Sequence, residues 1–109
     1  MRKLDYAMIG LRIKEKRKLL GYRRDEMAEY LGVSDKFCAD IENGDRGMSL
    51  STLNKISEFL FVSTDYILFG DVKKTDISEL VEIFKFCPKN KIRYAEDILR
   101  IYIKSINSD

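Results

Sequence analysis

Apolar residues recur at intervals of three and four along almost the whole chain, which is the spacing that places them on one face of an α-helix. This spacing predicts seven helices, at about residues 5–20, 24–31, 35–43, 50–60, 64–70, 76–86 and 88–106. One proline and six glycines leave these stretches largely uninterrupted. The pattern therefore predicts an all-α fold, whose first five helices share a core made of Ile9, Ile13, Leu20, Met27, Ala28, Leu31, Cys38, Ile41, Leu53, Ile56 and Leu60.

Three serines mark the starts of predicted helices. A hydroxyl at such a position can accept a hydrogen bond from an amide of the first helical turn, as we expect for Ser34, Ser49 and Ser63. Gly32 opens a three-residue turn between the short second and third helices, where glycine tolerates the backbone angle that a tight turn needs. Two short helices joined in this way are typical of a helix-turn-helix, although many helical hairpins share the pattern.

The longer segment from Ile9 to Gly70 carries a more specific signal. It resembles the Cro/phage-repressor-like (XRE) helix-turn-helix family nearly end to end, in IGLRIKEKRKLLGY, DEMAEYLGVS and IENGDRGMSLSTLNKISEFLFVSTDYILFG. The resemblance implies a five-helix lambda-repressor-like DNA-binding domain, followed in this chain by a C-terminal two-helix hairpin. It also implies that the third helix enters the major groove.

The resemblance further implies which side chains contact DNA bases: Ser34, Asp35, Lys36 and Asp40. A lysine can donate to guanine O6 and N7, and an aspartate can accept from the cytosine N4 amine. For Ser34, the alternative is a role as a helix cap alone. By the same resemblance, the phosphate-contacting residues are Arg23, Arg24, Asn43, Arg46 and Ser49.

Two further residues match positions that are structural in similar proteins. Arg17 and Glu42 correspond to an ion pair that ties the first helix to the third, so we expect both to stabilise the fold rather than to bind DNA. Removing one partner of such a pair would leave an uncompensated charge and destabilise the domain by a few kcal/mol.

The chain departs from the family pattern at both helices of the motif. Arg23 and Arg24 replace the usual Thr-Gln, which removes a side-chain cap and places positive charge at a helix N-terminus, against the macrodipole. Contact with phosphates would compensate for this. Asp35 and Asp40 direct carboxylates at a polyanion, so each needs a cytosine or a neighbouring basic side chain.

Charge by itself does not indicate a nucleic-acid-binding protein, because the formal net charge is only +2 over 109 residues. The charges are unevenly distributed along the chain. The segment from Arg12 to Arg24 contains a single acidic residue, Glu15, and seven basic residues: Arg12, Lys14, Lys16, Arg17, Lys18, Arg23 and Arg24. Such a cluster is typical either of a phosphate-facing surface or of a solvated helix face, and charge does not separate the two.

The chain has no histidine, and its two cysteines, Cys38 and Cys87, lie far apart. The usual general base and the commonest metal ligands are therefore missing, and we expect neither an enzyme nor a bound metal or cofactor. Because both cysteines stand in apolar contexts, we expect two buried thiols. No apolar run approaches the ~20 residues that cross a bilayer, and no secretory segment follows the N-terminal charges, so we expect a cytoplasmic protein.

The C-terminal third predicts a separate helical hairpin. A polar linker at 71–75 divides a DNA-binding domain at 1–70 from a hairpin at 76–109, a layout that also resembles small bacterial repressors. The apolar stripe of these last helices is wider than one neighbouring helix can cover. We expect the hairpin to pair with a second copy, with docking onto the first domain as the alternative; the predicted interface comprises Phe84, Ile98, Leu99, Tyr102, Ile103 and Ile106.

Together these features predict a sequence-specific DNA-binding transcription regulator, a repressor that binds an inverted-repeat operator as a homodimer. The expected partners are double-stranded DNA, a second copy of the chain and an antagonist protein, with no membrane. The alternative is a protein-interaction module that binds an antitoxin or antagonist, with a secondary or degenerate DNA-binding domain. The two carboxylates on the third helix favour that alternative.

Overall fold

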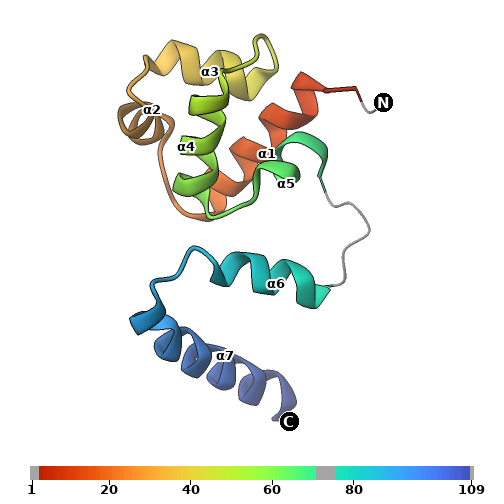
Figure 1. The fold of residues 1–109 in the computed structure, drawn as a ribbon, viewed down its shortest axis with the longest axis vertical. Helices are drawn as coiled ribbons and strands as arrows, with labels where there is room; N and C mark the ends of the chain where they lie inside the picture. Colours follow the sequence, from red (N-terminus) through yellow and green to blue (C-terminus); the bar gives the residue numbers. More distant parts are fainter. Residues whose placement is uncertain (1–2, 71–75, 109) are drawn as a thin grey trace. The chain divides into compact units, whose positions relative to one another are not determined.

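The computed structural model describes residues 3–70 and 76–108, and the described chain divides into two compact units, Met1–Lys74 and Thr75–Asp109. The predicted linker at 71–75 lies outside the described residues. The all-α prediction is confirmed (Figure 1), with α1 (Tyr6–Leu19), α2 (Arg24–Leu31), α3 (Asp35–Asn43), α4 (Leu50–Leu60) and α5 (Thr64–Phe69) in the first unit. The second unit holds α6 (Asp76–Phe84), the 3-10 turn η1 (Lys89–Lys91) and α7 (Ile92–Asn107).

Helix starts follow the predicted caps closely. The side chains of Ser34, Ser49 and Ser63 accept hydrogen bonds from the amides of Phe37, Thr52 and Tyr66, respectively. The Asp5 carboxylate plays the same part for α1, accepting from the Met8 amide at 3.2 Å. The five helices of the first unit therefore begin within a residue of the positions that the sequence predicts.

The C-terminal helices differ more from their predicted bounds, because the chain tightens before Pro88. The amides of Lys85, Phe86 and Cys87 each donate to the carbonyl three residues earlier, so α6 ends at Phe84 rather than near residue 86. Proline disfavours helical backbone only at Cys87, the residue directly before it, and the three shorter hydrogen bonds end the α-helix earlier, at Phe84. Then η1 intervenes, and α7 begins at Ile92 rather than near Pro88.

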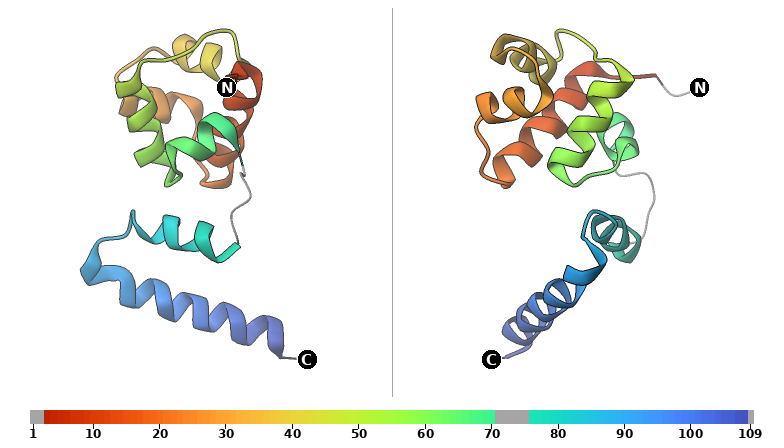
Figure 2. Two further views of the ribbon diagram at one scale, coloured as in Figure 1. Left: turned by 45° about the vertical axis from the view of Figure 1, so that its right-hand side comes forward. Right: turned by 60° about the vertical axis from the view of Figure 1, so that its left-hand side comes forward.

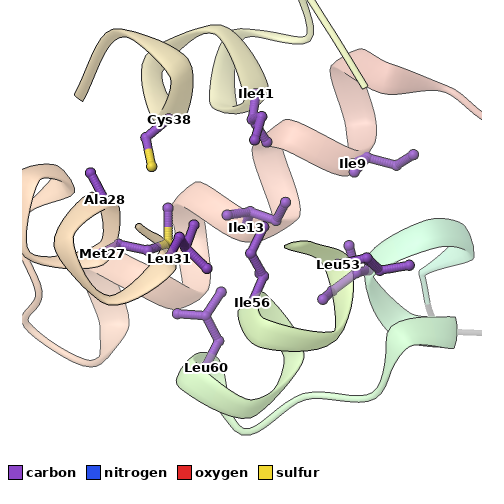
Figure 3. Packing of buried hydrophobic residues seen from close by; sticks show 11 residues of the cluster. Ile9, Ile13, Met27, Ala28, Leu31, Cys38, Ile41, Leu53, Ile56 and Leu60 are labelled. Carbon is purple, nitrogen blue, oxygen red and sulfur yellow. The ribbon is translucent and has the colours of Figure 1, made fainter. Parts of the chain in front are cut away.

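The core of the first unit gathers around Ile13, with side chains from α1 to α4 pointing toward one another (Figure 3). Every predicted core residue is buried except Leu20, which is 38% exposed. That prediction was wrong because α1 ends at Leu19 and the chain turns away from the helical face at Leu20. Ile67 of α5 completes the core.

Cys38 is buried in this core, and burial raises the pKa of its thiol to about 11. Cys87 is only partly buried, so the prediction of two buried thiols holds for Cys38 alone. The difference arises because Cys38 lies on the inner face of α3, whereas Cys87 lies in the turn that follows α6.

Two glycines let α1 and α3 approach each other closely. A Cβ added at Gly10 would lie 2.4 Å from the carbonyl oxygens of Ile41 and Glu42, a separation that real Cβ atoms do not show. Gly44 ends α3 with a φ of +79°, and a Cβ there would lie 2.6 Å from the Cα of Ala7. Backbone contact between the two helices therefore fixes where α3 lies.

The second unit carries its apolar side chains outward. Among its described residues 77–108, none is buried. On α7, the most exposed apolar side chains are Tyr94, Ile98, Ile101, Tyr102, Ile103 and Ile106, each more than half exposed. Within the described residues, no helix is long and apolar enough to cross a membrane.

Candidate nucleic-acid interface

The two helices α2 and α3 are neighbours joined by the tight turn 32–34, as the two views of Figure 2 show. Gly32 ends α2 with a φ of +72°, in the left-handed region that glycine tolerates. The inner face of α3 is anchored by Cys38, Ile41 and Glu42, which are all buried. The N-terminal end of the helix, at Ser34, Asp35 and Lys36, is exposed to solvent.

A buried ion pair connects α1 to α3. The Arg17 guanidinium donates from Nε and Nη2 to the two carboxylate oxygens of Glu42, at 2.6 and 2.9 Å, and from Nη1 to the carbonyl of Tyr22 at 2.8 Å. Both side chains are buried, with 8% and 3% exposed. The prediction that this pair is structural is confirmed. Arg17 is therefore not available to a phosphate.

At the open end of the motif, the first residues of the two helices pair with each other. Arg24 of α2 donates from Nε and Nη2 to the two carboxylate oxygens of Asp35 of α3, both at 3.0 Å. The two side chains are 42% and 50% exposed. This hydrogen bonding lowers the pKa of the Asp35 carboxyl and raises the pKa of Arg24, so the pair stays ionised.

The second carboxylate of α3 also has a cation beside it. The Lys36 ammonium lies 3.3 Å from each carboxylate oxygen of Asp40, one helical turn later. Both aspartates that the sequence placed toward DNA are thus neutralised by basic residues of the same motif. The repulsion expected from two unpaired carboxylates does not arise.

Beyond the C-terminal end of α3, Arg46 lies over an aromatic ring. Its guanidinium carbon is 3.9 Å from the ring centroid of Phe37, close enough for a cation–π contact. Asn43, the last residue of α3, is exposed, as is Arg46. Ser49 caps α4, and its hydroxyl also donates to the Thr52 hydroxyl at 3.1 Å.

The positive charge of the two arginines at the N-terminus of α2 is balanced more fully than the sequence predicts. Within the described part of the chain, Arg23 supplies no side-chain cap, as expected, but its backbone amide donates to the Glu26 carboxylate at 2.8 Å. The first turn also carries the acids Asp25 and Glu26, and Asp25 accepts from the Arg23 guanidinium at 3.1 Å. These acids offset the positive charge at the helix N-terminus.

Comparison with known proteins identifies the fold. Residues 13–67 match the family model described as Helix-turn-helix, and the HTH-type transcriptional regulator YonR, from an SPbeta prophage of Bacillus subtilis (strain 168), is 36% identical over 74 residues, 68% of each chain. The chain belongs to the XRE-type helix-turn-helix family of transcription regulators. Its members are regulators that bind DNA and not enzymes, and the five-helix domain is the lambda-repressor-like one.

Two solved structures of a related regulator are informative. SinR, described as the master regulator for biofilm formation, is 39% identical in its complex with DNA, with a TM-score of 0.52 over 55% of this chain and 97% of that one. A chain of the SinR–SinI protein complex is 30% identical, with a TM-score of 0.55 over 90% of this chain and 99% of that one.

In this helix-turn-helix regulator, the basic cluster of the sequence does not form one surface. Arg12 donates to the carbonyl of Ile67 in α5 at 3.1 Å, and the Lys16 ammonium lies 5.2 Å from the ring centroid of Tyr66. Because α1 and α5 approach each other closely, both side chains contact residues of α5. Of the seven basic residues, Arg23 and Arg24 lie in the helix-turn-helix motif itself, at the start of α2.

Proposed function

We propose that this transcription regulator binds an inverted-repeat operator as a homodimer and represses transcription in the cytoplasm. Residues 1–70 act as the DNA-binding domain, and residues 76–109 act as the pairing hairpin. The observation that carries the proposal is the position of α3, which is anchored on one face by Cys38, Ile41 and Glu42 and open to solvent on the other. A rigid, half-exposed helix of this kind suits insertion into a major groove.

The charge arrangement around α3 supports DNA as the partner. Because Asp35 and Asp40 are each paired with a basic side chain, neither presents an unneutralised carboxylate to the phosphates. Ser34, Lys36 and Asp40 contact bases from the exposed face, and the phosphates are contacted by Arg23, Asn43, Arg46 and Ser49. SinR, a relative with the same fold, has been seen in complex with DNA.

Homodimerisation is supported by the exposed apolar side of α7. Ile98, Tyr102 and Ile106 recur every four residues along one side of this helix and are 59–66% exposed. Exposed isoleucine and tyrosine side chains that follow one side of a helix for about two turns are stabilised by burial against a second copy. Two paired molecules would present two copies of α3, so that an inverted repeat is read once in each half.

The test is a gel-shift titration of the full chain against a random DNA pool, followed by footprinting of the selected sites. We expect an inverted repeat whose half-sites are one helical turn apart, and an affinity that falls as salt rises. Arg46→Gln should weaken binding to all sequences and reduce the salt slope by about 1, whereas the control Lys104→Gln on α7 should leave both unchanged. Failure to bind any sequence at low salt would overturn the proposal.

One observation favours a second function for the hairpin. The chain is similar over 90% of its length to a chain of the SinR–SinI complex, in which one protein is bound to another. The exposed apolar side of α7 would suit an antagonist of similar helical character. Such a partner would compete with the second copy of the chain, and its addition would release DNA.

A further inference from the structure

Arg24 and Asp35 stand eleven residues apart, yet they meet at the open end of the motif because α2 and α3 both begin there. The carboxylate accepts from Nε and Nη2, both at 3.0 Å, so the guanidinium is held by two parallel hydrogen bonds rather than one. Such a bidentate contact fixes the plane of the guanidinium as well as its position. By contrast, Lys36 beside Asp40 is a single ammonium on a side chain that is 83% exposed.

The remaining donors of Arg24 point away from Asp35. A guanidinium carries five N–H groups in a fixed plane, and the carboxylate uses only the edge formed by Nε and Nη2. The edge formed by Nη1 and the second N–H of Nη2 has no other acceptor among the described residues. This free edge has the donor spacing that matches the O6 and N7 acceptors of guanine in the major groove.

Because the Arg24–Asp35 pair has no net charge, it should affect contact with a phosphate and contact with a base differently. A phosphate attracts an arginine chiefly through its charge, and an arginine neutralised by a bidentate carboxylate loses most of that attraction. The free N–H donors of Arg24 can still form hydrogen bonds to a base, because the pairing with Asp35 fixes their geometry. The pairing therefore suits base readout better than the phosphate contact that the sequence assigns to Arg24.

We infer that Arg24, oriented by Asp35, reads a guanine in each half-site of the operator. Arg24 then determines specificity at that guanine, and Asp35 is a positioning residue rather than an acceptor for cytosine. This inference rests on the proposed function, since it requires that the start of α3 lies in the major groove.

The test is to select bound sites from a random DNA pool with the 109-residue chain and its variants. For the unchanged protein, we expect a guanine at one symmetric position in each half-site. Arg24→Gln should lose the preference at that position alone and should weaken binding to the selected site by about 10- to 100-fold. The control Arg23→Gln, which removes the adjacent arginine, should weaken binding to all sequences and leave the preferences in place.

A base analogue and the partner variant complete the test. Replacing the guanine with 7-deazaguanine should weaken binding by the unchanged protein and should have no effect on Arg24→Gln. Asp35→Asn should relax the guanine preference and steepen the salt dependence, because it frees the charge of Arg24 for phosphates. Circular dichroism confirms that the variants remain folded.

The outcomes separate this inference from the proposed function. If the unchanged protein selects an inverted repeat but Arg24→Gln weakens all sequences equally, Arg24 is a phosphate contact and the inference fails while the proposed function stands. If the unchanged protein selects no sequence, both fail.

Discussion

Single residues in this protein have roles that depend on how completely their charges are buried. Arg17 and Glu42 are removed from water and face each other through two hydrogen bonds, whereas Lys36 and Asp40 form an ion pair on the exposed face of α3. Buried charge is expensive without its partner, and exposed charge is solvated by water. Both pairs involve α3 but should contribute very differently to stability.

Glu42→Ala should lower the free energy of unfolding by about 3–5 kcal/mol, because it leaves the buried Arg17 guanidinium without its carboxylate. The matched control in the same helix is Lys36→Ala, which breaks the exposed pair and should change the free energy by less than about 1 kcal/mol. Urea denaturation followed by circular dichroism measures both. Equal effects of the two variants would contradict the structural role of the buried pair.

The pairing of Arg24 with Asp35 predicts a pH dependence. Hydrogen bonding to Arg24 holds the pKa of Asp35 below its ordinary value of 3.8. Since the folded pKa is lower than the unfolded one, the pair stabilises the fold fully above the unfolded value and loses this effect as the pH falls through the folded value. In Arg24→Gln, NMR titration of the Asp35 carboxyl should show its midpoint rising toward 3.8. An unchanged midpoint would mean that the two side chains do not pair in solution.

At the scale of helices, the position of α3 depends on how closely it approaches α1. Gly10 lies in the middle of α1, where glycine lowers helical stability relative to alanine by about 1 kcal/mol. The structure explains its presence, because the carbonyl oxygens of Ile41 and Glu42 occupy the space that a side chain would need. The close contact also brings Arg17 within reach of Glu42.

Gly10→Ala should therefore destabilise the protein by about 1–3 kcal/mol, despite the better helix propensity of alanine, because α1 and α3 must move apart. It should also weaken DNA binding, since α3 carries the exposed face of the motif. The control is Gly47→Ala, where the atoms nearest to the added Cβ belong to the side chain of Tyr6, at 3.0 Å and beyond, rather than to the backbone. Thermal melts and gel shifts give the two readouts. Stabilisation by Gly10→Ala would show that the contact is looser than described.

At the scale of the whole molecule, the two units differ in how far they bury their apolar side chains. The first unit has a core shared by five helices, whereas residues 77–108 of the second include none that is buried among those described. The half-buried side of α7 carries Ile92, Ala95 and Leu99, and Ile98, Tyr102 and Ile106 are more exposed. A second molecule is the partner that we propose for this exposed side.

Ile98→Asp should convert the proposed homodimer into a monomer, because a carboxylate cannot be buried without a partner at an apolar interface. Sedimentation velocity measures the mass, and operator affinity should fall with it. Asn107→Asp adds the same charge at the polar C-terminal end of α7 and should leave the dimer intact. A monomeric unchanged protein, or an Ile98→Asp variant that remains dimeric, would contradict this arrangement.

Much of the fold and part of the candidate site follow from the sequence alone. Periodicity and capping serines located the helices of the first unit, because those signals act within a few residues of each other. The family resemblance identified the DNA-binding motif and the Arg17–Glu42 pair. The bounds of α6 and α7 were less well predicted, since the tightening before Pro88 depends on backbone geometry that apolar spacing does not record.

Only the tertiary structure decided how the charged residues are paired. The sequence shows Arg24 and Asp35 eleven positions apart and assigns them to different DNA contacts, but the crossing of α2 and α3 brings them within 3.0 Å. The packing of α1 against α5 likewise brings Arg12 and Lys16 to Ile67 and Tyr66, and its packing against α3 places Gly10 against the backbone of Ile41 and Glu42. Helix formation is governed by neighbours along the chain, whereas ion pairing and close approach depend on distances that exist only after the helices have packed.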